Sequence, residues 1–157
     1  MERYMKLLPG SRLHKIPKDL PVASLIMCFY AERALYAIVE KGGGTLGKSL
    51  LLVGFDLMGI FCAMAAKSAG LSPVKVLVDK ENPAAQSIIY ALKCELVIKL
   101  EKDESYDIVI VNTKQPDIVE QAFNSLNPLG RCVYLTSDAP GHFSLQKVLE
   151  NNGDYES

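Results

Sequence analysis

The hydrophobic positions of this chain follow two kinds of pattern. In the first, four to six mostly apolar residues follow one another, as in Leu50–Val53, which is typical of strands buried on both faces of a sheet. In the second, apolar residues recur every three or four positions, as on one face of a helix. The runs predict strands at 50–53, 74–78, 95–100, 107–111 and 131–136. The periodic stretches predict helices at 22–40, 57–69, 84–93 and 116–126.

Glycine and proline residues mark the ends of these elements. The glycines at 42–44 are expected to stop the first helix, and Gly70 is placed to cap the second. Pro83 and Pro116 stand where the third and fourth helices begin, a position that tolerates the missing N–H. The residues at 127–130, Asn-Pro-Leu-Gly, predict a turn before the last strand.

Strands that alternate with helices across short polar connections predict a parallel sheet with helices on both faces. The predicted fold class is therefore α/β, a three-layer, doubly wound sheet of Rossmann type. Right-handed crossovers give the strand order 3-2-1-4-5. Residues 1–21 are interpreted as an extended lead-in and 22–142 as a domain of the dinucleotide-binding type. Residues 143–157 form a final short element and a frayed tail, in which 143–149 fits either a short sixth strand or a helix.

Composition narrows the picture further. The chain has 157 residues, enough for one domain, and a net charge of −1 argues against a nucleic-acid or anionic-membrane partner. No apolar stretch is judged to approach the ~20 residues that span a bilayer. Four cysteines lie apart in apolar contexts and are expected to be buried free thiols. They are Cys28, Cys62, Cys94 and Cys132. A cytoplasmic location follows as an expectation, since the N-terminus also lacks the order of a secretion signal.

The first strand runs into the segment Gly54-Phe55-Asp56-Leu57-Met58-Gly59, which opens the second helix. A strand, a tight glycine turn and a helix form the phosphate-binding corner of a dinucleotide fold, with the spacing G-x-G-x-x-G. Asp56 replaces the middle glycine, where the backbone must approach the pyrophosphate. A carboxylate there would repel a bound diphosphate, but aspartate is also a preferred helix N-cap. We therefore expect Asp56 to cap the helix and to fill the anion site from within the chain.

Other candidate cofactor contacts follow the second, fourth and fifth strands. Asp79 stands where a carboxylate would bind the adenosine ribose and favour NAD over NADP, a preference that Lys80 weakens. Asn112 and Thr113 follow the fourth strand, and Thr136 follows the fifth, where ligands of open parallel sheets collect. Polar residues after strands are also ordinary turn formers. Neither a catalytic acid–base pair nor a nucleophile can be assigned from spacing, and the only histidines are His14 and His142.

Several segments, in this order, resemble the cofactor-binding domain of the medium-chain, zinc-type alcohol-dehydrogenase-like reductases. The resemblance covers roughly residues 12–137. It is carried by Lys15-Ile16-Pro17-Lys18-Asp19-Leu20-Pro21, by Cys28 and Ala34-Leu35, by Gly-Lys-Ser-Leu-Leu-Leu-Val-Gly at 47–54, by Ala65-Ala66-Lys67-Ser68-Ala69-Gly70 and by Leu129-Gly130-Arg131. The resemblance implies an NAD-linked oxidoreductase.

The chain also departs from the family, whose members are usually more than twice as long and carry a substrate domain that is absent here. Cys28 lies where zinc-dependent members keep one catalytic-metal ligand, but its partners would belong to the absent domain. No zinc is therefore expected, and Cys28 is interpreted as a core residue. Related cofactor domains often pair through the last strand of the sheet, so a homodimer is expected. A separate chain could supply the substrate domain.

Three functions remain open at this point. The first is the dinucleotide-binding domain of an alcohol-dehydrogenase-like oxidoreductase that cannot catalyse alone. The second is a non-catalytic Rossmann-fold module for binding or assembly, with its cofactor affinity lost through Asp56. The third is an S-adenosylmethionine-dependent protein, because such proteins also use a glycine-rich turn after the first strand.

Overall fold

A computed structural model describes residues 6–13, 15–78, 83–101 and 103–135. Their helices are α1 (Val22–Leu35), α2 (Leu57–Ser68), α3 (Pro83–Ala91) and α4 (Pro116–Asn124), and a π-helical segment, η1 (Tyr36–Lys41), continues α1. The strands are β1 (Leu50–Val53), β2 (Val74–Leu77), β3 (Glu95–Val97), β4 (Tyr106–Val111) and β5 (Leu126–Tyr134). The five strands and four helices predicted between residues 22 and 136 all occur, with ends that differ by a few residues.

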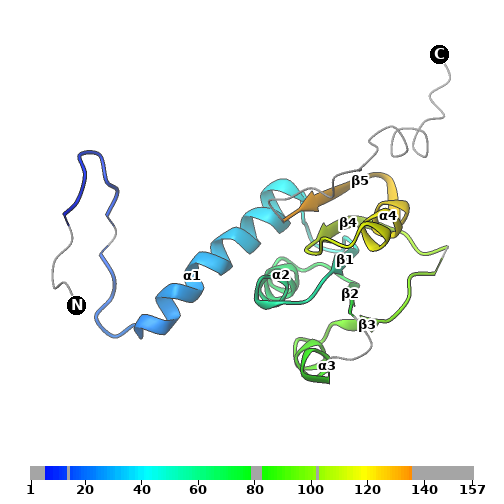
Figure 1. The fold of residues 1–157 in the computed structure, drawn as a ribbon, viewed down its shortest axis with the longest axis horizontal. Helices are drawn as coiled ribbons and strands as arrows, with labels where there is room; N and C mark the ends of the chain where they lie inside the picture. The colour runs from blue at the N-terminus through cyan, green and yellow to red at the C-terminus, as the bar shows by residue number, and fades with distance from the viewer. Residues whose placement is uncertain (1–5, 14, 79–82, 102, 136–157) are drawn as a thin grey trace, which may run out of the picture.

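The five strands form one parallel sheet in the order β3-β2-β1-β4-β5, as predicted (Figure 1). β1 lies at the centre, where Leu50 is level with Val74 of β2 and with Ile108 of β4. All side chains of β1 are buried, because helices cover both faces of the sheet. The α/β fold class of Rossmann type is confirmed.

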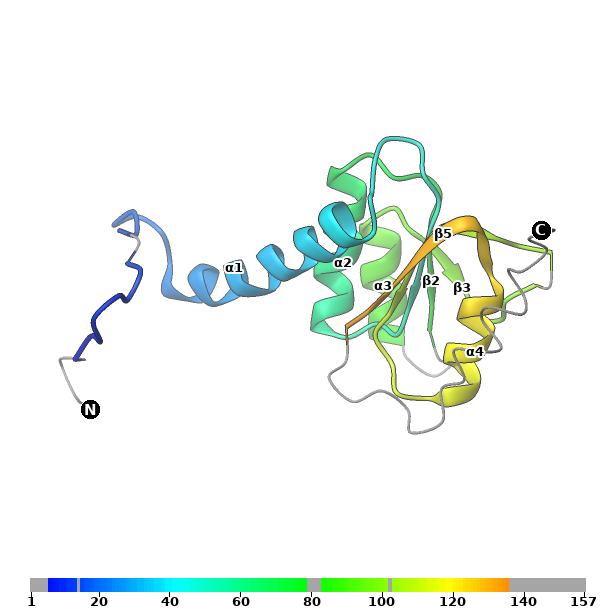
Figure 2. The same cartoon turned by 90° about the horizontal axis from the view of Figure 1, so that it is seen from above.

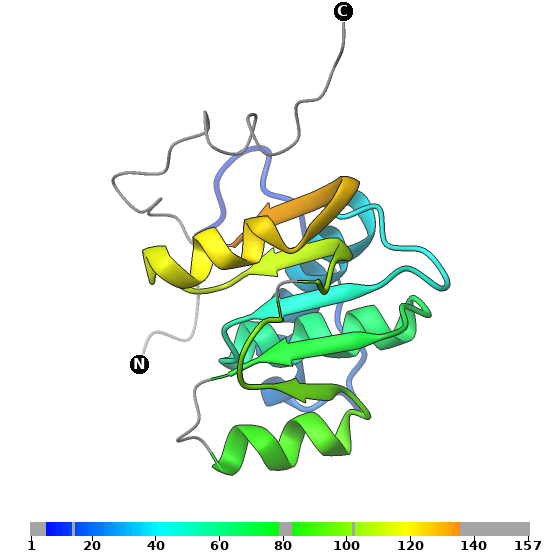
Figure 3. The same ribbon diagram turned by 90° about the vertical axis from the view of Figure 1, so that its right-hand side faces the viewer.

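The two faces of the sheet carry separate apolar cores. Leu50 and Leu52 point to the side of α2, whose Cys62, Ala63 and Ala66 are buried against them. Leu51 and Val53 point to the opposite side, where α4 supplies Val119 and Ala122. Figure 3 shows α4 in front of the sheet and α1 and α2 behind it. The small residues of α2 let this helix pack closely on the central strand.

The predicted turn at 127–130 lies inside β5. Tyr106 of β4 is level with Leu126 and Ile108 with Arg131, so three additional residues bulge out of β5 between these pairs. Leu129 is 93% exposed there with a φ of 63°. The sequence signal marked a local departure from the extended chain correctly, but the strand continues on both sides of it.

Cysteine burial corrects one expectation. Cys62 and Cys94 are buried and Cys132 is half-buried, but Cys28 is exposed on α1 instead of lying in a core. Burial raises the pKa of Cys62, and of Cys132, to about 12. Cys28 was assigned to the core because its neighbours are apolar, and these neighbours are themselves largely exposed.

The helical stretch Val22–Lys41, formed by α1 and η1, corrects a second expectation. It has 20 residues, and its most apolar 18-residue part has a mean hydropathy of 1.6, so by length and composition alone it could cross a membrane. Only 17% of its most apolar part is buried within the protein. The expectation that no apolar stretch reaches this length was wrong. The absence of a membrane partner stays a prediction.

Candidate functional site

The carboxyl ends of β1 and β4 define the candidate site, because the order of the strands reverses between them. Gly54 follows β1 with a φ of +88°, and a Cβ at this position would overlap the backbone carbonyl of Asn112. The N–H of Asn112 in turn donates to the carbonyl of Val53 at 2.8 Å. Only glycine fits here, since both the left-handed backbone and the neighbouring carbonyl exclude a side chain.

Gly59 holds the helix side of the same corner. It is buried in the first turn of α2, and a Cβ here would lie 2.9 Å from the carbonyl oxygen of Gly54. This close approach of helix and strand is the role of the third glycine in the dinucleotide fingerprint. The chain's own packing therefore accounts for both glycines.

Asp56 is the N-cap residue of α2, as the sequence predicted. Its backbone is extended, with φ −108° and ψ −163°, and its Oδ1 atom accepts a hydrogen bond from the Gly59 N–H at 3.0 Å. The side-chain amide of Asn112 donates to the same oxygen at 2.6 Å. A carboxylate thus takes up the Gly59 N–H in the first turn of the helix, where a phosphate would otherwise bind.

Asn112 and Thr113 lie beside this corner and make different contacts. Asn112 binds Asp56 across 56 positions of sequence, a partnership that sequence reasoning missed. The Thr113 carbonyl accepts a hydrogen bond from the Tyr134 hydroxyl at 3.1 Å, which ties the end of β4 to β5. Thr113 also lines a cavity of about 350 Å³ together with Gly54, Leu77, Ile98 and Gln121. That volume lies at the lower end of the range for small-molecule pockets.

The remaining predicted contacts fall into two groups. Phe55 and Met58 are partly buried against the core on the α2 side, and Leu57 is 40% exposed. They shape the corner through packing. Three further candidates lie outside the described residues, namely Asp79, Lys80 and Thr136. The proposed short element at 143–149 lies outside them as well.

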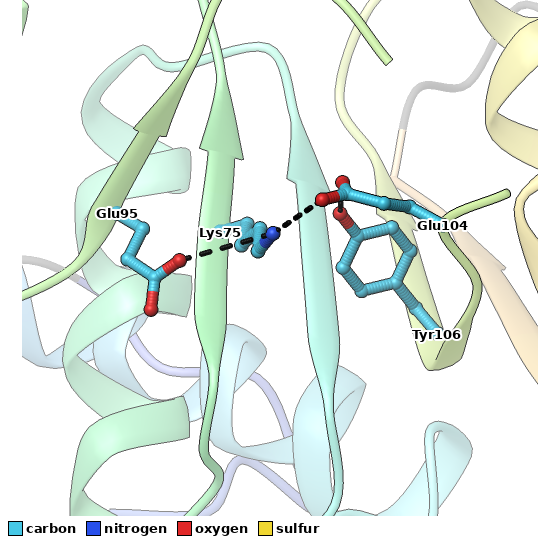
Figure 4. A network of polar contacts seen from close by, with 4 residues as sticks. All are labelled: Lys75, Glu95, Glu104 and Tyr106. Carbon is cyan, nitrogen blue, oxygen red and sulfur yellow. Dashed lines mark hydrogen bonds and ion pairs between the residues drawn. The ribbon is translucent and has the colours of Figure 1, made fainter. Parts of the chain in front are cut away.

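A polar cluster on the α4 side fastens the connection between β3 and β4 (Figure 4). The Lys75 ammonium lies 2.8 Å from Glu104 and 3.8 Å from Glu95, and the Tyr106 hydroxyl donates to Glu104 at 2.7 Å. The hydrogen bond between Lys75 and Glu104 raises the pKa of Lys75 and lowers the pKa of Glu104. Burial, aided by Glu104, raises the pKa of the Tyr106 hydroxyl. We assign the cluster a structural role, because it ties Glu104, just before β4, to Lys75 of β2.

A second cluster joins β1 and β4 at the amino end of the sheet, which is the end opposite to the candidate site. One carboxylate oxygen of Asp107 accepts hydrogen bonds at 2.9 Å from the N–H and from the hydroxyl of Ser49. Asn127 donates to the other oxygen at 3.0 Å. These bonds lower the pKa of Asp107. Within the described part of the chain, no three His, Cys, Asp or Glu side chains are grouped so as to hold a metal ion.

Comparison with solved structures places this geometry among known folds. An alcohol dehydrogenase (TADH) from Thermus sp. ATN1 matches with a TM-score of 0.72 and 18% identity, over 88% of this chain and 44% of that one. The 2R,3R-butanediol dehydrogenase from Bacillus subtilis matches with a TM-score of 0.68 and 19% identity, over 87% and 42%. CurK enoyl reductase gives 0.70 and 16%, over 87% and 43%. This chain has the fold shared by part of each.

The likeness to alcohol-dehydrogenase-like reductases is thereby confirmed at the level of the fold. The chain spans less than half the length of these solved proteins. No family model matches the sequence. The function of this chain therefore depends on the chemistry of the corner around Gly54 and Asp56.

Proposed function

We propose that this chain is the dinucleotide-binding domain of an alcohol-dehydrogenase-like oxidoreductase, in which Asp56 weakens the binding of NAD. The fold and the glycine corner support the first part, because both are the framework on which such proteins hold a dinucleotide. The solved neighbours are about twice as long as this chain, so the substrate domain of such an enzyme would lie outside these 157 residues, on a separate chain or in another part of a longer protein. Without that domain, catalysis by this chain alone is not expected.

The position of the Asp56 carboxylate carries the proposal that binding is weak. A bound diphosphate would need the N–H groups that this carboxylate now occupies, and it would meet a like charge. At a separation of 4 Å, one unit-charge repulsion costs about 1 kcal/mol in bulk water and about 4 kcal/mol near a protein surface. Because Asp56 is exposed, the penalty lies between these limits, which corresponds to roughly a fivefold to a thousandfold loss of affinity.

The test is a calorimetric titration of NADH into the unmodified protein and into two variants. Asp56→Gly removes both the charge and the side chain, and we expect its NADH affinity to rise by at least about tenfold. Asp56→Asn is the matched control, because it keeps a capping side chain of the same size and removes only the charge. Micromolar NADH binding by the unmodified protein, or no gain in Asp56→Gly, would defeat the proposal.

A second candidate is a non-catalytic Rossmann-fold module for binding or assembly. The observation that favours it is the pair of hydrogen bonds on Asp56, which gives the residue a structural role without a cofactor. A thermal-shift panel with NAD, NADP, ADP-ribose and S-adenosylmethionine separates the candidates. Stabilisation of Asp56→Gly by NAD and ADP-ribose, which share the diphosphate, supports the first candidate, and a response to S-adenosylmethionine would favour the S-adenosylmethionine-dependent alternative. No response in Asp56→Gly to any of the four would support the second.

A further inference from the structure

The surface of α1 is apolar on nearly all sides, and the residues that the structure describes leave most of it uncovered. Val22 is 74% exposed, Ile26 61% and Phe29 55%. Ala34 is the only residue of α1 itself that is buried within the part of the chain that the structure describes. A helix that is hydrophobic all round is normally buried in a larger core or a membrane. The composition of α1 therefore indicates that something covers it.

Only the C-terminal part of this helix rests on the domain. Ala34, Ala37 and Ile38 are buried, and the ring of Tyr30 stacks on that of Phe61 in α2 with centroids 5.9 Å apart. The N-terminal half projects away from the sheet (Figures 1 and 2). Packing at one end thus fixes the direction of the helix, while its other end presents an apolar surface beyond the domain.

A groove lies beside the fixed part of the helix. It runs between α1 with η1 on one side and the end of β5 on the other, and has a volume of about 640 Å³. Phe29, Arg33 and Tyr36 line the helix side, and residues 133–135 line the strand side. β5 is an edge strand of the described sheet. Apolar and aromatic side chains make up most of its lining, with Glu32, Arg33 and Lys41 among them, and Phe29 joins it to the uncovered surface of α1.

One stripe of the helix has the spacing of a coiled-coil seam. It consists of Val22, Ile26, Phe29 and Arg33 in α1 and continues into the wider turn of η1 with Tyr36 and Glu40, at alternating intervals of four and three residues. This stripe is complementary to itself when two copies run in opposite directions. Val22 then faces Glu40, Ile26 faces Tyr36, and Phe29 faces Arg33.

Two contacts of the antiparallel pair match in charge. The Arg33 guanidinium lies 5.4 Å from the Phe29 ring centroid within one chain, and in the antiparallel pair it would lie close to the partner's Phe29 as well. The first turn of α1 has neither a capping side chain nor an acidic residue. The Glu40 of a second copy would bring a negative charge to that positive helix end.

We propose that α1 pairs in antiparallel fashion with α1 of a second copy of this chain, each N-terminal half lying in the groove of the other. The two-fold arrangement makes one surface serve both partners. A stable interface buries about 800 Å² per partner. Phe29 and Tyr36, each about half exposed, supply about 200 Å² of that area, so the groove must be filled as well. The proposal does not depend on the proposed function.

The first test measures the mass of the protein by light scattering and sedimentation at tens of micromolar. We expect a dimer, and we expect Ile26→Glu and Phe29→Glu to raise its dissociation constant by about a hundredfold or more. Leu35→Glu is the matched control: Leu35 is 48% exposed on the same helix but lies outside the stripe, so this variant should stay dimeric. A monomeric unmodified protein, or equal loss in Leu35→Glu, would overturn the proposal.

The second test fixes the direction of the two helices by cross-linking. In a background of Cys28→Ser, a chain carrying both Ile26→Cys and Tyr36→Cys should form a disulfide-linked dimer under mild oxidation, whereas neither single variant should. Cross-linking by Ile26→Cys alone would mean parallel helices and contradict the arrangement. Binding of a monomeric protein to phospholipid vesicles, lost in Ile26→Glu, would assign α1 to a membrane surface instead.

Discussion

Replacing Asp56 by alanine should destabilise the folded domain, because one carboxylate oxygen holds two elements together. It accepts from the Gly59 N–H at the start of α2 and from the Asn112 amide at the end of β4. Loss of an aspartate N-cap costs about 1 kcal/mol. Loss of the bond to Asn112 adds roughly 0.5–1 kcal/mol, since this pair is exposed to water. The expected total is about 1.5–2 kcal/mol.

A double-mutant cycle separates the two contributions. Urea and thermal denaturation, each followed by circular dichroism, would be measured for Asp56→Ala, Asn112→Ala and the double variant. At roughly 2–4 °C per kcal/mol, Asp56→Ala should lower Tm by about 3–8 °C. The coupling between the two residues should be about 0.5–1 kcal/mol, as for side chains in direct contact. Asp56→Asn serves as the control, because asparagine caps helices about as well as aspartate does.

Two results would refute this account of Asp56. One is an unfolding free energy of Asp56→Ala within ~0.3 kcal/mol of the unmodified protein, an amount too small for a lost cap. The other is a coupling near zero, which would mean that Asn112 does not hold the carboxylate. The cycle also bears on the ligand test. Glycine at an N-cap costs only a few tenths of a kcal/mol, so Asp56→Gly should remain folded for titration.

Further predictions concern burial, backbone geometry and charge. Cys28 should react with a thiol reagent in the folded protein while Cys62 stays protected until unfolding, because Cys62 is buried and its pKa is raised to about 12. Gly54→Ala should lower Tm far more than Gly47→Ala: both residues have positive φ, but a Cβ meets backbone atoms only at Gly54. The folded-state pKa of Asp107 is depressed, so its bonds should stabilise the protein above about pH 4 and be lost as the pH falls through the folded pKa. Urea titrations of Asp107→Asn and the unmodified protein should therefore converge in acid.

Much of the fold could be predicted because it depends on residues near one another in sequence. The continuous apolar run Leu50–Val53 identified the central strand, and the glycine spacing at 54 and 59 identified the turn into α2. Asp56 was identified as the N-cap because its partner, Gly59, is only three positions away. Strand order followed from the handedness of crossovers, which is nearly invariant.

Other features required the tertiary structure, because they join positions that only the folded topology brings together. Asn112 reaches Asp56 across 56 positions, and Lys75 meets Glu104 across 29. The exposure of Cys28 was also unpredictable locally, since the apolar pattern of α1 signals burial without saying what covers the helix. The sequence by itself thus determined the elements, their order and the capped glycine corner. The tertiary structure decided which side chains meet there and that the described residues leave most of α1 uncovered, because contacts between distant residues depend on how the elements pack.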